Sequence, residues 1–359
     1  MTEPQPATGR STRPRMRFTD RVITMAHGAG GSSSEALIRH VFHPSFNDAE
    51  LAAADDGAVL RFEVVGTESL PDLVMTTDSF VVRPRRFPGG SIGTLAVCGT
   101  VNDLAVMGAE PKWLSVAFVL EEGLAIDELR DIVADMARMA ELSGVRIVAG
   151  DTKVVERGAA DGCYINTTGV GIRPRDTALG ADQVRAGDQV LVSGRLGDHG
   201  MAVLFARGDL ALSSDLESDC APLNDLISTV RAAAPQVRWM RDPTRGGLAS
   251  ALNELVRANG LSVSLEETAL PVTPAVLGAC ELLGLDPLYV ANEGKVVMVV
   301  HPDDAPNALA AMRAHPLGRY AAIVGTVQTD PARMVMVRTA FGGERIVDLL
   351  VGDPLPRIC

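Results

Sequence analysis

The chain has 359 residues, enough for about two domains, and its content of 47% hydrophobic and 22% charged residues excludes an intrinsically disordered protein. Its longest apolar runs are far shorter than the roughly 18 residues of a membrane-spanning helix, and a net charge of -12 disfavours a nucleic-acid-binding face. The five cysteines form no C-x-x-C pair, which argues against a zinc ribbon or a disulfide framework. We therefore expect a cytoplasmic protein that binds neither membranes nor nucleic acid.

Residues 1–21 contain Pro, Thr and Arg but no apolar segment typical of a signal peptide, so we expect a disordered extension there. The amphipathic pattern is clear from 126 to 142, where apolar residues recur at three- and four-residue steps and predict a helix that Gly144 ends. The other elements predicted in this half are a strand at 73–82, a helix at 92–107, a strand at 113–120 and a short buried strand at 145–149.

A motif with the pattern A-x-[D/E]-x-K-V-V occurs at 149–155 and again at 291–297, and each copy follows a Leu-Glu-Glu sequence. The two copies contain two of the three lysines of the chain. This repetition indicates an internal duplication of a strand–helix pattern. The paired residues are Asp151 and Lys153 in the first copy, and Glu293 and Lys295 in the second.

Strands that alternate with helices in both halves predict an α/β or α+β protein of two domains. The boundary is expected near 173–187, which contains Pro, Gly and Asp. At the end of the chain, Pro354 and Pro356 favour an extended strap that cannot join a helix. The expected organisation is an extension at 1–21, an N-terminal domain at 22–175, a C-terminal domain at 183–340 and a strap at 341–359.

The strap carries a thiol on its last residue, Cys359. A thiol on a mobile strap can enter an active site and carry an acyl-type group. An incidental cysteine on a frayed end explains the same residue. An exposed thiol beside its own carboxylate is a weak nucleophile, so a partner enzyme is needed to load it.

His27 to Ser34 form a glycine-rich segment, HGAGGSSS, before a helical run, so its backbone N–H groups could face an anion. An ordinary glycine loop with a serine cap explains the same letters. The chain contains neither a P-loop motif nor a well-placed G-x-G-x-x-G. This segment alone therefore does not identify a nucleotide site.

Four segments each carry an aspartate at a strand end or beside a turn-prone or apolar stretch, where an unpaired carboxylate is costly. Hard oxygen ligands from several elements suit Mg²⁺, which takes the rest of its coordination shell from water and phosphates. A helix cap or a turn explains each aspartate singly, whereas the four together predict a Mg²⁺ site. They are Asp78, Asp103, Asp151 and Asp242.

Taken together, these segments resemble the HypE family, the hydrogenase-maturation carbamoyl dehydratases of the AIR-synthetase (PurM-like) superfamily. The resemblance runs from about 25 to 359 and implies a two-domain PurM-like fold of the α/β (α+β) class, with a flexible C-terminal tail. The motifs that carry it are AHGAGG (26–31), TTDSFVV (76–82), FPGGSIG (87–93), GTVNDLAVMGAEP (99–111), LEEGL (120–124), VAGDTKVV (148–155), SGRLGDHG (193–200), RDPTRGGL (241–248), ANEGK (291–295) and PRIC (356–359).

The resemblance implies a homodimer whose N-terminal domains bind ATP and meet in a shared barrel-like sheet. In the family, the carbamoyltransferase HypF loads a carbamoyl group onto the terminal thiol, which is Cys359 here. ATP then phosphorylates the carbamoyl oxygen, and loss of phosphate leaves a protein thiocyanate. The thiocyanate donates cyanide to iron on the HypC–HypD complex.

The resemblance also implies roles for individual residues. Lys153 and Glu293 match positions that strip the two protons from the carbamoyl nitrogen, and Cys359 carries the substrate. For Lys153, a charge-stabilising role stays open beside that of a base, since a lysine is usually protonated at neutral pH. The residues matched to Mg²⁺ are Asp78, Asp103, Asp151 and Asp242, and those matched to ATP are His27, Gly28, Gly30, Gly31, Asn102, Asp103, Asp151 and Asp242.

Two alternative functions compete with this interpretation. A sibling ligase similar to selenophosphate synthetase or aminoimidazole ribonucleotide synthetase shares the fold, but residues 1–27 lack the Cys and Lys expected of the selenium enzyme. A nucleotide-responsive scaffold with a docking tail predicts ATP binding without turnover and tolerance of Cys359→Ser. The presence of Lys153, Glu293 and the terminal thiol argues against the scaffold.

Overall fold

The computed structural model describes most of the chain beyond residue 21. No helix in this part of the chain is long and apolar enough to cross a membrane. The expected extension at 1–21 and the predicted ATP-binding residue Gly30 lie outside the described residues. The described residues are 22–28, 31–42, 45, 55–61, 70–208, 215–330, 332–350, 355 and 357–359.

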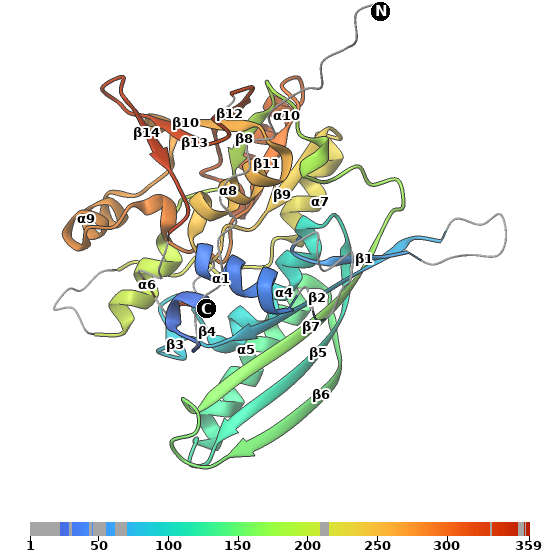
Figure 1. The fold of residues 1–359 in the computed structure, drawn as a ribbon. Helices are drawn as coiled ribbons and strands as arrows, with labels where there is room; N and C mark the ends of the chain where they lie inside the picture. The colour runs from blue at the N-terminus through green and yellow to red at the C-terminus, as the bar shows by residue number, and fades with distance from the viewer. Residues whose placement is uncertain are drawn as a thin grey trace, which may run out of the picture.

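A five-stranded sheet from the first half of the chain has the strand order β1-β2-β7-β5-β6 (Figure 1). β5 and β6 run parallel, and the other neighbours are antiparallel. Two long helices, α4 and α5, lie on one face of this sheet (Figure 1). The elements of this half are η1 (Met25–Gly28), α1 (Ser32–Leu37), a short π-helical turn η2 (Ile38–Phe42), β1 (Ala58–Leu60), β2 (Asp72–Phe80), β3 (Arg86–Phe87), β4 (Gly90–Ser91), α4 (Ile92–Val106), β5 (Glu110–Glu121), α5 (Ile126–Ser143), β6 (Arg146–Val155) and β7 (Cys163–Arg173).

α4 is the central helix of the molecule, because every one of its residues except Asp103 is buried. A helix that is apolar all round packs on all sides. Here the five-stranded sheet lies on one side, and α7 and β9 of the second half lie on another. The hydroxyl of Ser91 caps the helix by accepting from the N–H of Thr94 at 3.3 Å. The buried helix therefore joins the two halves, and Asp103 is its one partly exposed residue.

A seven-stranded sheet from the second half has the strand order β14-β13-β10-β12-β8-β11-β9. All four residues of β11 are buried, as expected for an inner strand covered on both faces. The elements are η3 (Ala181–Gln183), β8 (Gln189–Val192), α6 (Asp198–Ala206), α7 (Asn224–Ala233), β9 (Val237–Arg241), α8 (Gly247–Asn259), β10 (Ser262–Glu266), η4 (Glu267–Ala269), α9 (Pro274–Leu283), η5 (Pro287–Tyr289), β11 (Val297–Val300), α10 (Ala305–Ala314), η6 (Pro316–Gly318), β12 (Ala322–Gln328), β13 (Val335–Arg338) and β14 (Glu344–Val347).

The elements predicted for the first half are confirmed as β2, α4, β5 and α5. α5 is amphipathic, and Gly144 ends it in the left-handed conformation, with φ of 72°. The strand expected at 145–149 extends to Val155 as β6, and the prediction that this strand is buried is wrong. Because β6 is an edge strand that pairs only with β5, it is exposed along almost its whole length.

The two copies of the repeated motif differ in structure. The first copy, 149–155, is part of the edge strand β6 and is largely exposed. The second copy, 291–297, is a buried loop that leads into β11. β11 lies between β8 and β9 and is antiparallel to both, whereas β6 is parallel to its single neighbour. The same sequence motif therefore lies in an exposed edge strand in one copy and in a buried loop in the other.

Candidate active site

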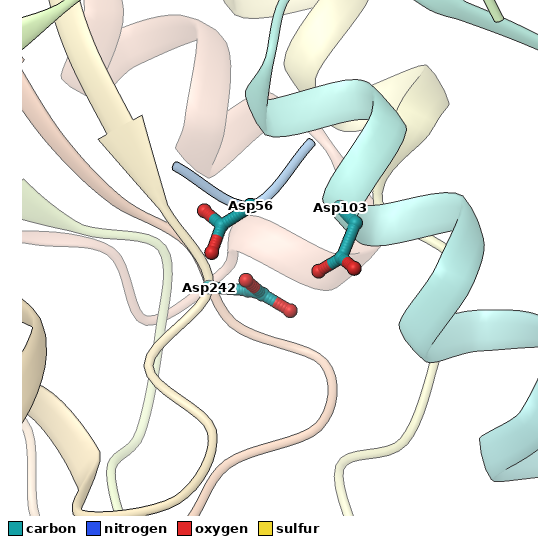
Figure 2. Close-up of side chains that lie close together, drawn as sticks. All are labelled: Asp56, Asp103 and Asp242. Atoms are coloured by element: carbon teal, nitrogen blue, oxygen red, sulfur yellow. The ribbon is translucent and has the colours of Figure 1, made fainter. Parts of the chain in front are cut away.

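Three carboxylates from distant parts of the chain meet where the two halves join. Asp56 lies just before β1, Asp103 lies on α4 and Asp242 directly follows β9; one oxygen from each lies within 4.8 Å of the others (Figure 2). Sequence reasoning named Asp103 and Asp242 but missed Asp56. The signal was present, because Asp56 belongs to a DDG turn directly before an apolar strand, the same context that singled out the other aspartates.

The surroundings of this acidic cluster oppose negative charge. Burial raises the pKa of Asp103 well above its usual value, and the neighbouring Asp78, Asp242 and Asp56 raise it further. Burial also raises the pKa of Asp242 to about 6, although Arg241 opposes the rise. Acidic groups this close together cannot all ionise at low cost unless a cation joins them.

Asp78 belongs to the same environment. It lies on the face of β2 that α4 covers, two residues after Thr76, whose hydroxyl donates to Asp103 at 2.8 Å. Burial raises the pKa of Asp78, and Arg245 partly offsets this effect. The structure therefore brings Asp78 to the cluster, as the sequence predicted.

One guanidinium anchors the cluster from the second half. Nε of Arg241 pairs with Asp56 at 2.8 Å, and its Nη2 pairs with Glu254 of α8 at 2.7 Å. Arg241 and the nearby Arg245 together still leave the acidic cluster with excess negative charge. Carboxylate oxygens in a half-buried cluster with that excess are the donor set that Mg²⁺ prefers, so the residues fit the predicted metal.

Glu293 is buried in the loop before β11, with 3% of its surface exposed. Its Oε1 has no hydrogen-bond partner among the described residues. Burial raises its pKa well above the usual value, and Asp242, Asp219 and Asp78 raise it further. A buried carboxyl group with an unused oxygen is suited to exchange a proton with a ligand.

Asn102 connects this loop to α4. Its Nδ2 donates to the carbonyl oxygens of Ala221 (3.2 Å) and Glu293 (3.3 Å), and its Oδ1 accepts from the N–H of Leu223 at 2.8 Å. The side chain is buried and holds three chain segments together. Asn102 therefore positions the Glu293 loop, while its predicted contact with ATP stays a prediction.

The glycine-rich segment lies against the end of the second half. His27 is buried, and its Nδ1 accepts from the N–H of Thr24 at 3.0 Å. Gly31 lies so close to the carbonyl of Leu350 that a Cβ would not fit. Gly28 is the last residue of the 3-10 helix η1. The predicted anion-facing role of this segment is not tested by these contacts.

Asp151 and Lys153 lie elsewhere in this chain. They pair with each other, and their side chains are 62% and 67% exposed. In the sheet register Asp151 lies beside Ala117, which lies beside Asn166 and so on the face of β2 opposite to Asp78. The structure does not bring Asp151 or Lys153 to the acidic cluster of the same chain.

The last residues of the chain run beside the segment that follows β2. The N–H of Val81 donates to the carbonyl oxygen of Cys359 at 3.1 Å, and the N–H of Arg83 donates to that of Arg357 at 3.3 Å. Ile358 is buried in the same hydrophobic core as much of α4, and Cys359 packs against that core. The terminal thiol is thus held at the junction of the two halves.

The two-domain fold and the acidic cluster between its halves are consistent with one class of protein. The sequence matches the AIR synthase related proteins, with the N-terminal domain of that family over residues 54–173 and the C-terminal domain over 185–337.

Within this class, the chain is 56% identical over 344 residues to the carbamoyl dehydratase HypE of Rhodobacter capsulatus, covering 96% of this chain and 100% of the relative. A chain of the solved HypE–HypF complex is 44% identical, with a TM-score of 0.81, and covers 88% of this chain and 100% of its own. A hydrogenase maturation protein HypE solved with ATP is 43% identical, with a TM-score of 0.77, over 94% and 100%. The chain belongs to the HypE family of carbamoyl dehydratases, and the predicted family and fold are confirmed.

Proposed function

We propose that this chain dehydrates an S-carbamoyl group on Cys359 to a thiocyanate, with ATP, and so supplies cyanide ligands for the iron of a [NiFe]-hydrogenase during its maturation. The observation that carries this proposal is the thiol of Cys359 held at the junction of the two halves in a chain that belongs to the HypE family. The thiocarbamate and ATP become the thiocyanate, ADP and phosphate.

The chemistry requires that the carbamoyl oxygen become a good leaving group. Attack of this oxygen on the γ-phosphorus of ATP forms a phosphate ester and releases ADP. The C–O bond then breaks, phosphate leaves with the oxygen, and the nitrogen loses both protons as the C≡N bond forms. No external oxidant or reductant is needed, because carbon keeps its oxidation state.

We assign ATP and Mg²⁺ to the acidic cluster and the glycine-rich segment. Asp56, Asp103 and Asp242, with Asp78 beside them, would hold Mg²⁺. When bound, Mg²⁺ neutralises charge on the phosphates of the nucleotide. The relative solved with ATP supports nucleotide binding by this fold.

We assign proton removal from the carbamoyl nitrogen to Glu293. Its Oε1 is buried and unpaired among the described residues, so an entering N–H group would find an acceptor there. Burial raises its pKa, which makes the ionised carboxylate a stronger base than an exposed glutamate.

A homodimer would use the uncovered face of the five-stranded sheet. An apolar row crosses this face, because Met75 on β2, Val170 on β7 and Trp113 on β5 are neighbours in register. Met75 and Trp113 are 43% and 38% exposed, and α4 and α5 cover the other face (Figure 1). Burying such a row against a second copy favours association and supports the barrel-like contact expected for the family.

Asp151 and Lys153 point to the same uncovered face. A two-fold axis parallel to the strands would place β6 of one copy over the edge strand β1 of the other, and Asp56 lies directly before β1. We therefore assign Asp151 as a metal ligand, and Lys153 as a base or charge stabiliser, to the site of the second copy.

Two partners follow from this reaction. HypF would load the thiol, and the solved complex between HypE and HypF supports this partner. The HypC–HypD complex would accept cyanide on iron, since a protein thiocyanate is a cyanide donor that needs a metal acceptor.

Intact-protein mass spectrometry tests the proposed function. The chain is incubated with a HypF-type carbamoyltransferase, carbamoyl phosphate and Mg·ATP, with Cys359→Ser as the control. We expect a gain of roughly 43 Da that falls to roughly 25 Da as the loaded thiol is dehydrated, and no gain in the control. Consumption of ATP without an adduct on Cys359 would contradict the proposal.

A further inference from the structure

His199 on α6 is completely buried and uses both ring nitrogens. Its Nε2 lies 2.9 Å from the carbonyl oxygen of Ile358, and its Nδ1 lies 2.8 Å from the hydroxyl of Ser218. A carbonyl oxygen only accepts, so Nε2 carries the proton, and Nδ1 accepts from the Ser218 hydroxyl. Burial lowers the pKa of His199, which keeps the ring neutral in this tautomer.

Ser218 is itself held in place by backbone contacts. Its oxygen accepts from the N–H of Cys220 at 3.1 Å, which leaves its hydroxyl proton for His199. Its own N–H donates to the carbonyl oxygen of Pro88 at 2.8 Å, and the ring of Phe87 packs edge-on against His199 at 5.5 Å between centroids. Three hydrogen bonds therefore run in one direction: the N–H of Cys220 donates to Ser218, the hydroxyl of Ser218 donates to His199, and His199 donates to Ile358.

The residue after Ser218 reaches the Glu293 loop. Asp219 accepts from the N–H of Glu293 at 3.0 Å, and it pairs with Lys295 at 2.8 Å. Although burial opposes this, Lys295 lowers the pKa of Asp219, so the buried carboxylate stays ionised. Gly294 touches the backbone of Asp219 so closely that a Cβ would not fit. The loop that carries Glu293 is thus fixed to the segment that contacts His199.

A second residue near α6 holds the strap. Nη2 of Arg207, just after α6, donates to the carbonyl oxygen of Arg357 at 2.7 Å, and its Nε donates to that of Arg83 at 2.9 Å. Arg207 and His199 therefore hydrogen-bond the carbonyl oxygens of Arg357 and Ile358, the two residues directly before Cys359. Departure of the strap would leave the Nε2–H of His199 buried without its acceptor, which is unfavourable.

We infer that His199 is a positioning residue for the dehydration: it fixes the register of the strap that carries Cys359 and, through Ser218 and Asp219, ties that register to the Glu293 loop. This inference rests on the proposed function. His199 acts through Ile358 and Ser218 and exchanges no proton with substrate.

The test compares His199→Leu, which removes both hydrogen bonds, with His199→Gln, whose amide can keep a donor and an acceptor. His301→Leu, at a half-exposed histidine paired with Asp303, is the matched control. Two rates are measured by mass spectrometry. One is alkylation of Cys359 by iodoacetamide without ATP, and the other is single-turnover dehydration of the carbamoyl-loaded full chain, with the KM for ATP.

In His199→Leu, we expect alkylation to be roughly tenfold faster and dehydration roughly tenfold slower, with an unchanged KM for ATP, because only the strap is misplaced. His199→Gln is expected within about threefold of wild type, and His301→Leu at the wild-type rates. Wild-type rates in His199→Leu, a Gln variant no better than Leu, or a KM that rises with the loss of rate would each overturn the inference.

If His199→Leu fails to fold, Ser218→Ala tests the same chain of hydrogen bonds. It removes the donor to Nδ1, and it is expected to shift both rates in the same direction by a smaller factor. Wild-type rates in Ser218→Ala would overturn the inference. Failure of the proposed function is distinguishable, because the wild type would then form no thiocyanate while the alkylation comparison still reports on the strap.

Discussion

Asn102 donates its side-chain amide to the backbone carbonyl oxygen of Glu293 at 3.3 Å. Its neighbour on α4, Asp103, belongs to the acidic cluster. Adjacent residues of one buried helix thus reach both the predicted metal site and the loop of the predicted base. α4 thereby fixes the separation between the acidic cluster and the Glu293 loop.

Asp103→Asn removes one charge from the crowded acidic cluster. We expect the metal-free variant to melt a few degrees above wild type, because a buried carboxyl group that resists ionisation is replaced by a neutral amide. It should also lose the extra stabilisation that Mg·ATP gives to wild type. Thermal melts with and without Mg·ATP check both effects, with the exposed Asp176→Asn as control. A full Mg·ATP response in Asp103→Asn would remove this residue from the metal site.

Glu293→Gln keeps the shape of the side chain and the backbone N–H that binds Asp219. Loading of Cys359 should proceed at the wild-type rate, whereas dehydration should slow by roughly 10²–10⁴-fold, since a proton acceptor is lost. Quenched samples analysed by intact mass spectrometry separate the two steps. Glu281→Gln, on the exposed surface of α9, is the control. Thiocyanate formation at the wild-type rate would show that another group accepts the proton.

The raised pKa of Glu293 also predicts a pH dependence of stability. Because the folded protein binds this proton more tightly than the unfolded chain, the contribution of Glu293 to the free energy of unfolding is fully present below about pH 4.5. It is lost as the pH rises through the raised folded-state pKa. Metal-free melts should therefore show Glu293→Gln gaining on wild type as the pH rises above 4.5. A difference in melting temperature that does not change with pH would contradict this assignment.

Val170→Glu places a charge in the middle of the apolar row on the uncovered sheet face. If that face joins two copies, the variant should sediment as a monomer at concentrations where wild type is a dimer, because a buried unpaired charge opposes association. Leu282→Glu, on α9 at a position that is 73% exposed, is the matched control and should leave the assembly unchanged. A dimeric Val170→Glu would place the interface elsewhere.

Mixed dimers test whether Lys153 acts across the interface. Lys153→Ala and Asp103→Asn should each be inactive, but a dimer with one chain of each kind retains one complete site. After equal mixing and re-association, about half of the dimers are mixed, so roughly a quarter of wild-type activity should return. Single-turnover thiocyanate formation measures this. No recovery in a mixture that demonstrably exchanges chains would place Lys153 in the site of its own chain.

Local sequence patterns were sufficient to predict α5 and three members of the acidic environment. The helical spacing of apolar residues in 126–142 predicted α5 itself, but not which of them are buried. Met136 and Met139 lie on the buried face, whereas Ile126, Val133 and Leu142 are exposed. Asp78, Asp103 and Asp242 each stood beside apolar or turn-prone residues, where an unpaired carboxylate is costly. Asp56 carries the same local signal, because it belongs to a DDG turn directly before an apolar strand.

Contacts between distant segments could not be predicted in this way. The letters of β6 look like a buried strand, but burial depends on which neighbours cover it, and β6 lies at the edge of the sheet. His199 sits in the motif SGRLGDHG, and its acceptor Ile358 lies 159 positions away. No local periodicity encodes that pairing, because it depends on where the strap docks.

The central claim is that the oxygen of the carbamoyl group on Cys359 leaves as part of phosphate. The thiol is loaded from carbamoyl phosphate that carries ¹⁸O on both oxygens bound to carbon, and unlabelled Mg·ATP is then added in unlabelled water. We expect one ¹⁸O atom in each phosphate released during the single turnover that forms thiocyanate. Unlabelled phosphate, with the label recovered in water, would show that ATP does not activate this oxygen and would contradict the account.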